Sequence, residues 1–296
     1  MRIAITGKAG QVVTSLLERR LFAGHELIVL GRPELDLADP ASVSRAIEAV
    51  APDAIVSAAA YTAVDKAESD SELAYAINGT GAGMVAEVAR VLGVPLVHIS
   101  TDYVFDGRRE RPYVESDPTG PTGIYGASKL AGEQAVLAAH GSNSAVLRVA
   151  WVYSPFGCNF VKTMLDLAGD RDEVSVVADQ LGNPTSALDI ADGILSVVAN
   201  LVASPDPALR GIFHMTASGE ASWADFAEAI FAVSAAQGGP SARVLRIGTA
   251  DYQTPAMRPA NSRLDCGLIA RVHGVALPDW HQSLETVIGR LQPAIH

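Results

Sequence analysis

The stretch MRIAITGKAGQVV (residues 1–13) decides the fold class of this chain. An apolar, β-rich run over residues 1–6 ends at Gly7, and a helix-like segment begins at Gln11. Glycines at positions 7 and 10 let the backbone turn tightly and approach a pyrophosphate on the helix N-terminus. Because the turn directly follows a strand and precedes a helix, we predict that Gly7, Gly10, Gln11 and Val12 bind a dinucleotide. The alternative is a tight turn that holds no ligand.

Further short runs along the chain are apolar nearly throughout rather than alternating, as is typical of parallel strands buried on both faces. These strand-like runs cover residues 26–30, 54–58, 96–100 and 145–149. Helix-like segments lie between them, at residues 11–21, 41–50, 72–92 and 128–140. Strand and helix in regular alternation predict an α/β fold with a doubly wound parallel sheet, which is Rossmann-like.

The regular alternation fades after Val149. The expected elements in this half are helices at 159–168, 187–202 and 223–235, a strand at 211–215 and a proline-containing loop at 255–263. Residues 1–150 are predicted to form the dinucleotide-binding domain, with residues 187–214 packing back onto it. Residues 151–186 and 215–296 are predicted to form a smaller C-terminal substrate-binding domain, with the substrate in the cleft between the two.

Composition excludes several classes of protein. The chain has 296 residues, of which 49% are hydrophobic, so it can bury a core and is not mainly disordered. Its formal net charge of −11 makes it a poor partner for nucleic acid or anionic lipid. No apolar run approaches the ~18 residues of a membrane span, and a strand follows Met1 directly, so we expect no membrane span and no signal peptide. Cys158 and Cys266 are too few for a disulfide framework and suit a reduced, cytoplasmic protein.

The tip of the second strand bears on the choice of cofactor. A carboxylate there would bond the ribose 2′-hydroxyl of NAD, whereas this chain has Arg32, which suits a 2′-phosphate. We therefore favour NADPH, with NADH as the alternative, since Arg32 could also be a solvated surface side chain. Asp36 and Leu37 follow, and they are candidates to border the adenine.

Tyr125 and Lys129 form a candidate catalytic pair, because residues spaced i and i+4 share one face of a helix. A phenol gives up its proton reluctantly at neutral pH, and a nearby ammonium favours the phenolate. Lowering the phenol pKa by about 3 units takes about 4 kcal/mol. Such pairs arise by chance, but this one lies between the fourth and fifth strands of a dinucleotide-binding fold. Thr101 lies at the end of the fourth strand. It either hydrogen-bonds the substrate oxygen that Tyr125 contacts or caps a turn.

These residues, taken with further segments, resemble the extended short-chain dehydrogenase/reductase superfamily and, within it, the family of dTDP-4-dehydrorhamnose reductases. The resemblance runs from Met1 to about Trp280, nearly the whole chain. The similar segments are AAAYTAVDKAE (58–68), STDYVFDG (100–107), WVY (151–153), NFVKTM (159–164), DQLGNPT (179–185), RPANSRL (258–264) and LPDW (277–280).

The resemblance implies reduction of the C4 ketone of dTDP-4-dehydro-6-deoxy-L-mannose to dTDP-L-rhamnose by NADPH or NADH. It implies that Tyr125 is the general acid, that Lys129 lowers its pKa and holds the nicotinamide ribose, and that Thr101 tunes the site. The cofactor contacts it implies are Gly10, Gln11, Val12, Asp36, Leu37, Ala59, Ala60 and Tyr61. The sugar-nucleotide contacts it implies are Thr101, Asp102, Tyr103, Asn159 and Trp151, whose indole face would lie against the sugar.

Arg258 is a candidate to meet the diphosphate, which would reconcile an acidic protein with an anionic substrate; the alternative is a packing role. The chain departs from the family at Val13, where many members have a glycine. Some members form homodimers bridged by Mg²⁺ through carboxylates. This chain offers Glu18 but has Ser15 one turn earlier, so we predict no metal and leave a homodimer open.

Two other functions compete with this interpretation. A different nucleotide-sugar 4-ketoreductase, epimerase or dehydratase is the nearest, although a dehydratase usually has a carboxylate after the Thr-Asp pair, where this chain has Tyr103. The other is a non-catalytic regulatory subunit of the same family, such as that of eukaryotic methionine adenosyltransferase. A damaged Tyr/Lys pair would favour the regulatory subunit, but Tyr125, Lys129 and Thr101 are all present.

Overall fold

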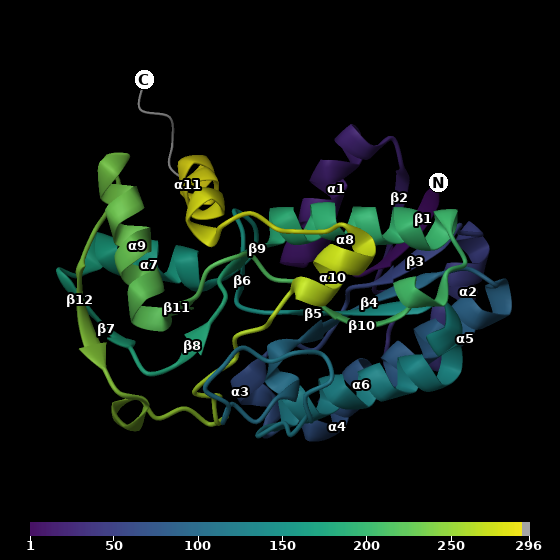
Figure 1. The fold of residues 1–296 in the computed structure, drawn as a ribbon, viewed down its shortest axis with the longest axis horizontal. Helices are drawn as coiled ribbons and strands as arrows, with labels where there is room; N and C mark the ends of the chain where they lie inside the picture. The colour runs from purple at the N-terminus through teal and green to yellow at the C-terminus, as the bar shows by residue number, and fades with distance from the viewer. Residues whose placement is uncertain (292–296) are drawn as a thin grey trace.

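A computed structural model describes residues 1–291 (Figure 1). Within these residues, six parallel strands form a central sheet in the order β10-β5-β4-β3-β1-β2. Their bounds are β1 Arg2–Thr6, β2 Glu26–Leu30, β3 Ala54–Ser57, β4 Leu96–Thr101, β5 Ser144–Val149 and β10 Gly211–His214. The predicted α/β fold is confirmed, and the apolar runs marked these strands to within one residue at each end.

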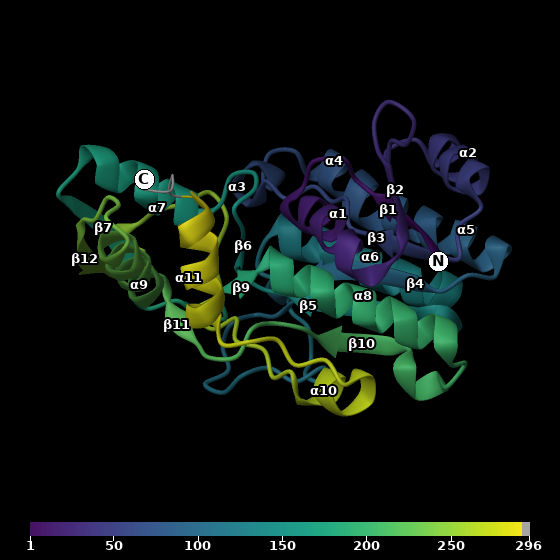
Figure 2. The same ribbon diagram turned by 90° about the horizontal axis from the view of Figure 1, so that it is seen from above.

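Helices cover both faces of the sheet (Figures 1 and 2). On one face, α1 packs beside α8, and on the other, α5 packs between α2 and α6. Their bounds are α1 Gln11–Ala23, α2 Pro40–Val50, α5 Ala82–Leu92, α6 Ile124–His140 and α8 Ala187–Ala203. Ile3 and Ile5 pack in the layer of α1 and α8, whereas Ala4 packs in the layer of α2 and α5. Burial on both faces therefore explains why the strands are apolar throughout.

The second half of the chain builds a separate core beside the sheet, around Phe226, Ile230, Trp280 and Leu284. Helix α10 Gly267–His273 packs instead against α8 and β10 of the sheet layer. The helices of the separate core are α7 Phe160–Asp170, α9 Trp223–Ala236 and α11 Trp280–Leu291. Its strands pair as β6 Val152–Tyr153 with β9 Thr185–Ser186, β8 Leu181–Gly182 with β11 Ala221–Ser222, and β7 Glu173–Val177 with β12 Arg243–Ile247. The sequence did not predict α10, α11 or these strands, four of which, β6, β8, β9 and β11, are only two residues long.

The predicted helix over 72–92 is confirmed as a continuous helical stretch, but its middle part is π-helical rather than α-helical. The chain forms α3 (Val64–Ala67) and α4 (Ser71–Tyr75), and a π-helical segment over Ala76–Gly81 then leads into α5. The wider turn places Asn78 in the interior, where its Oδ1 accepts from the Tyr61 amide at 2.8 Å and its Nδ2 donates to the Ser128 hydroxyl at 3.0 Å. The π-helical segment thus ties the loop after β3 to helix α6.

Helix α6 begins at Ile124, four residues earlier than predicted, so its first turn includes Tyr125. The Ile124 amide at this end donates to the Glu68 carboxylate at 2.8 Å. Gly126 made an early start hard to predict, because glycine disfavours helix. Its role is close approach: a Cβ at residue 126 would lie 2.1 Å from the Tyr103 carbonyl oxygen, and one at Gly132 would lie 2.1 Å from that of Asn78.

A buried ion pair fixes α6 to the sheet. Glu133 of α6 and Arg148 of β5 are 1% and 2% exposed, and they meet in two parallel hydrogen bonds of 2.9 and 2.7 Å. The Ser100 hydroxyl on β4 donates to the same carboxylate at 2.5 Å. The guanidinium also lies 4.9 Å from the centroid of the Phe105 ring. Such a pair is stable only when its hydrogen bonds are satisfied, as they are here.

We expect Arg148→Met to lower the free energy of unfolding by about 3–5 kcal/mol, because it leaves the Glu133 carboxylate buried without its cation. The double variant Glu133→Gln/Arg148→Met should recover part of that loss. Urea denaturation measures both. Arg243→Met is the matched control, since Arg243 pairs with Glu173 on the surface and should matter by less than about 1 kcal/mol. Equal losses in the Arg148 and Arg243 variants would contradict this account.

Candidate active site

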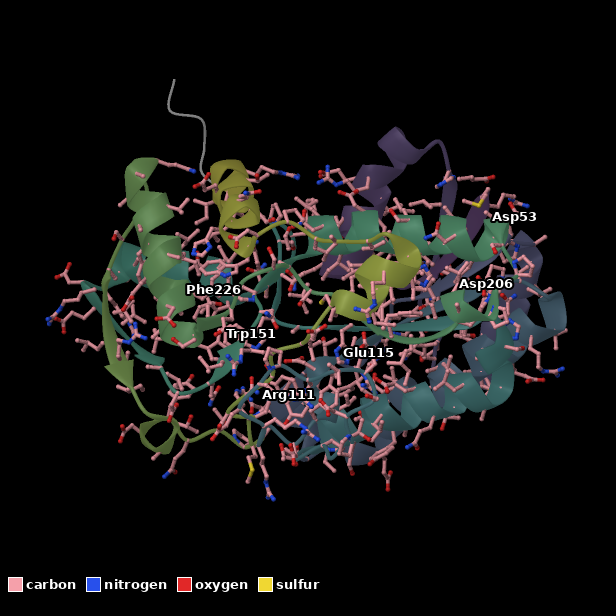
Figure 3. The ribbon with its side chains drawn as sticks, viewed as in Figure 1. Asp53, Arg111, Glu115, Trp151, Asp206 and Phe226 are labelled. Atoms are coloured by element: carbon pink, nitrogen blue, oxygen red, sulfur yellow. The ribbon has the colours of Figure 1, made fainter. Side chains whose placement is uncertain are left out.

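A cavity of about 520 Å³ lies where the carboxyl ends of the strands meet the second half of the chain. This edge is where open α/β sheets bind ligands, at the point between β1 and β3 where the strand order reverses. Figure 3 shows Trp151 at this junction. The cavity is lined from both halves by Gly10, Gln11, Val12, Ala58, Ala60, Thr101, Asp102, Tyr103, Tyr125, Lys129, Trp151, Cys158, Phe160 and Trp223, among others.

The predicted catalytic residues Tyr125, Lys129 and Thr101 meet in this cavity. Burial raises the pKa of Tyr125 to about 12, although hydrogen bonding by the Thr101 hydroxyl opposes the rise. The Lys129 ammonium donates to the Ile99 carbonyl oxygen at 2.7 Å. Burial lowers the pKa of Lys129 to about 8, and the nearby Glu133 carboxylate opposes this. Burial therefore has the largest effect on the pKa of the Tyr125 phenol, and lowering of this pKa by Lys129 stays a prediction.

Thr101 is the last residue of β4, and Asp102 follows it. Of the two alternatives given for Thr101, capping of a turn is confirmed, while a hydrogen bond to the substrate stays a prediction. The Thr101 hydroxyl accepts from the Tyr103 amide at 3.2 Å and so caps the short 3₁₀ turn Asp102–Val104, while it also lines the cavity. It donates to the Asp102 carboxylate at 2.9 Å. Burial raises the pKa of Asp102 to about 6, against the effect of hydrogen bonding by Ser262 and Thr101. The Asp102 carboxyl therefore keeps its proton to a higher pH than an exposed aspartic acid does.

Tyr103 bears on the competing dehydratase. Its ring meets that of Tyr125 edge-on, with centroids 5.7 Å apart. Burial raises its pKa well above that of a free phenol, so it stays protonated and cannot serve as a base at neutral pH, as a carboxylate would. The position after Thr101 and Asp102 therefore lacks the group that a dehydratase needs.

An adjoining cavity of about 450 Å³ gathers most of the predicted cofactor contacts. Those that line it are Gly7, Gly10, Arg32, Asp36, Leu37, Ala59 and Ala60. Tyr61 lies outside both linings as described, and its hydroxyl donates to the Asp70 carboxylate at 3.1 Å. Lys8 also lines this cavity, although the sequence analysis did not predict it. Its ammonium pairs with the carboxylate of Glu34, which lies two residues after Arg32.

The glycine-rich turn fits a dinucleotide. Gly7 has φ +105°, which favours glycine, and Gly10 precedes the first turn of α1. Within the described residues, no side chain caps α1, so its first amides are free to hold a pyrophosphate. Four helices, α2, α7, α8 and α9, are capped by the side chains of Asp39, Asn159, Ser186 and Ser222, whereas α5 and α6 resemble α1 in having no side-chain cap among residues 1–291.

Asn159 and Arg258 are not part of either lining as described. Asn159 caps α7 and donates from Nδ2 to Gln11 Oε1 at 3.0 Å, so it braces a cavity residue. Arg258 is only partly exposed and pairs with Asp65 at 2.9 Å. Trp223, by contrast, lines the site but was not predicted; its only sequence signal was an aromatic residue at the start of an amphipathic helix.

The described part of the chain contains neither a metal-binding cluster nor a membrane-spanning helix. Among residues 1–291, no group of three or more His, Cys, Asp or Glu side chains is placed to hold a metal ion. Glu18 is instead paired with Arg290 through two contacts of 2.7 Å. None of the helices in those residues has the length and apolar character needed to cross a bilayer.

Comparison with known proteins agrees with this geometry. The family model described as the RmlD substrate binding domain matches residues 1–292. A dTDP-4-dehydrorhamnose reductase of Sinorhizobium fredii is 50% identical, over 98% of each chain, and one of Escherichia coli K12 is 39% identical, also over 98% of each.

Solved structures agree as well. A dTDP-4-dehydrorhamnose reductase from Clostridium acetobutylicum, 36% identical, superposes with a TM-score of 0.92 over 99% of this chain and 100% of its own. Another, from Bacillus anthracis in complex with NADP, is also 36% identical and has a TM-score of 0.88 over 97% of this chain and 98% of its own. This chain therefore belongs to the family of dTDP-4-dehydrorhamnose reductases.

Proposed function

We propose that this chain reduces the C4 ketone of dTDP-4-dehydro-6-deoxy-L-mannose to dTDP-L-rhamnose, with NADPH as the hydride donor. The observation that carries the proposal is the meeting of Tyr125, Lys129 and Thr101 in a cavity that adjoins the turn at Gly7 and Gly10. Relatives of that name, 39% and 50% identical, support the substrate. Two observations support NADPH as the cofactor: the structure of a relative in complex with NADP, and the exposed Arg32 near the glycine-rich turn.

Tyr125 is the proton donor. The cofactor supplies a hydride to the sugar C4 when it is bound. Tyr125 supplies the proton for the oxygen on that carbon, since a pKa of about 12 keeps the phenol protonated at neutral pH. An alkoxide is far more basic than a phenolate, so transfer of the Tyr125 proton is downhill.

Lys129 and Thr101 assist the donor. The pKa of Lys129, about 8, leaves most of the ammonium charged at neutral pH, and this charge stabilises the phenolate that remains after proton transfer. Thr101 hydrogen-bonds at the phenol and opposes the effect of burial on its pKa. The two residues thus stabilise the product of proton transfer while burial keeps the starting acid neutral.

The two halves of the chain divide the binding. Residues 1–150 with 187–214 bind the cofactor, and residues 151–186 with 215–296 bind the sugar nucleotide through Trp151. Asp102 and Tyr103 of the first unit also contact the sugar, from the other side of the cleft. The pairing of β10 with β5 supports the assignment of 187–214 to the first unit. Arg258 meets the diphosphate by exchanging its contact with Asp65.

The setting proposed for the enzyme is the cytoplasm, where its two free thiols, Cys158 and Cys266, stay reduced. The homodimer is proposed from the family resemblance, and light scattering during size-exclusion chromatography measures it.

The direct test is the absorbance of reduced nicotinamide, followed with dTDP-4-dehydro-6-deoxy-L-mannose made in situ. We expect oxidation of NADPH that depends on the sugar nucleotide, and faster than that of NADH because Arg32 suits a 2′-phosphate. Cofactor binding without turnover would point to another 4-keto sugar or to a regulatory subunit.

Tyr125→Phe should lower turnover by about 10² to 10⁴-fold, the usual contribution of general acid catalysis. NADPH affinity should stay within about twofold, since the phenol oxygen is removed without changing the ring. Steady-state kinetics and fluorescence titration measure the two quantities. Turnover within tenfold of the parent would rule out Tyr125 as the acid.

Asp102→Asn should change how stability depends on pH. The folded pKa of Asp102, about 6, is raised from 3.8, so its carboxyl favours folding fully below about pH 3.8 and loses that effect as pH rises through 6. Asparagine does not titrate, so the variant does not lose this contribution as the pH rises. The difference in free energy of unfolding, variant minus parent, should therefore increase by about 1.4 kcal/mol between pH 5 and pH 8.

Urea denaturation at both pH values measures this gain. Asp106→Asn is the matched control, because a hydrogen bond from Tyr113 lowers the pKa of Asp106, so this carboxyl is ionised in both the folded and the unfolded chain above pH 5 and its variant should show no such gain between pH 5 and pH 8. The same trend in both variants would contradict the assignment to burial at Asp102.

A further inference from the structure

Trp151 has an unusual backbone. Its φ of +46° lies in the left-handed region, which only one other non-glycine residue, Ala51, shares within residues 1–291. Trp151 lies two residues beyond the end of β5 at Val149, at the edge of the sheet where the cavity opens. A large side chain persists in this conformation only where its surroundings fix it.

One face of the Trp151 ring is covered by Trp223. The two rings are stacked with centroids 3.6 Å apart and an interplanar angle of 5°. Trp223 is itself held firmly at the start of α9, where Ser222 and Asp225 form a reciprocal cap. The Phe160 ring leans on it with a centroid distance of 4.6 Å.

The other face of the Trp151 ring meets the backbone of Gly182. A Cβ at residue 182 would lie 2.3 Å from Cε2 and 2.4 and 2.6 Å from the bonded neighbours Nε1 and Cζ2. Since the nearest atom is the one between the other two, this Cβ would stand over the ring rather than beside its edge. Trp223 already fills one face, so Gly182 lies against the opposite one. The indole Nε1 donates to the Ser262 hydroxyl at 3.2 Å, which fixes the rotation of the ring.

These contacts change the expected mode of sugar binding. The sequence predicted that the indole face would lie against the sugar, but the Trp223 ring and the Gly182 backbone cover the two faces. The ring can therefore offer only its edge to the cavity. Trp151 and Trp223 line that cavity together with Tyr125 and Lys129.

We infer that Trp223 is a positioning residue, which clamps Trp151 against Gly182 so that the indole edge forms a rigid wall of the sugar site. The inference rests on the proposed function, in which Trp151 contacts the sugar. The clamp sets the affinity for the sugar nucleotide and leaves cofactor affinity alone, because neither tryptophan lines the adjoining cofactor cavity as described.

Kinetics of Trp223 variants test this inference. Trp223→Ala should raise KM for the sugar nucleotide roughly fivefold to tenfold, in line with the loss of one aromatic stack. It should change kcat and KM for NADPH less than about twofold. Trp223→Phe keeps a ring at the same place and should restore KM to within about twofold of the parent. Unchanged KM in Trp223→Ala, or an equal loss in both variants, would overturn the inference.

Gly182→Ala tests the clamp from its other side and keeps both tryptophans. Its methyl group would displace the Trp151 ring, so KM for the sugar nucleotide should rise as in Trp223→Ala. The stacked pair should give an exciton couplet in far-ultraviolet circular dichroism, which Gly182→Ala should weaken. Trp280→Phe is the control, since Trp280 stacks on His281, and the couplet should persist. A couplet undiminished by Gly182→Ala would overturn the clamp.

The two proposals fail separately. The couplet is measured without substrate, so it tests the clamp even if the parent enzyme does not turn over the sugar nucleotide. A parent that oxidises NADPH with this sugar, but whose Trp223→Ala variant keeps the parental KM, would leave the proposed function standing and remove the clamp.

Discussion

The ion pair between Glu133 and Arg148 is the constraint on which the site depends. It is almost wholly excluded from water, and it joins α6 to β5 and, through Ser100, to β4. Tyr125, Lys129 and Glu133 are spaced four residues apart, so they share one face of α6. Fixing Glu133 to the sheet therefore also fixes where the proton donor and its ammonium partner lie.

The charges along this face balance one another. The Glu133 carboxylate lies between two cations and opposes the effect of burial on the pKa of Lys129. Without that carboxylate, burial would favour a neutral amine, which stabilises a phenolate poorly. Contacts between the halves brace the site from outside its lining: Asn159 holds the lining residue Gln11, and Arg258 pairs with Asp65. The proton donor Tyr125 is thus held in place by α6, and the lining residue Gln11 is held in place by contacts between the two halves of the chain.

The sequence was informative where one local signal sufficed. Apolar runs located the sheet, and the spacing of Tyr125 and Lys129 selected residues that do line one cavity. It failed where distant packing decides. Gly126 made the start of α6 hard to predict, because this glycine is required by the close approach of the Tyr103 backbone, which the local sequence does not reveal. Trp223 gave little signal because its stacking partner, Trp151, lies 72 positions earlier in the chain. The dominance of burial at Tyr125 likewise depends on neighbours from several elements, which spacing does not reveal.

The close contacts of Gly126 and Gly132 bear on how this enzyme could be made more heat-resistant. Replacing a helical glycine with alanine usually gains up to about 1 kcal/mol, because the unfolded chain loses freedom. In α6 the added methyl would collide with the carbonyl oxygens of Tyr103 or Asn78. Engineering should therefore turn to α7, where a methyl at Gly169 would meet nothing within 4 Å. The helix that carries the acid is closed to the simplest stabilising change, whereas the periphery is open to it.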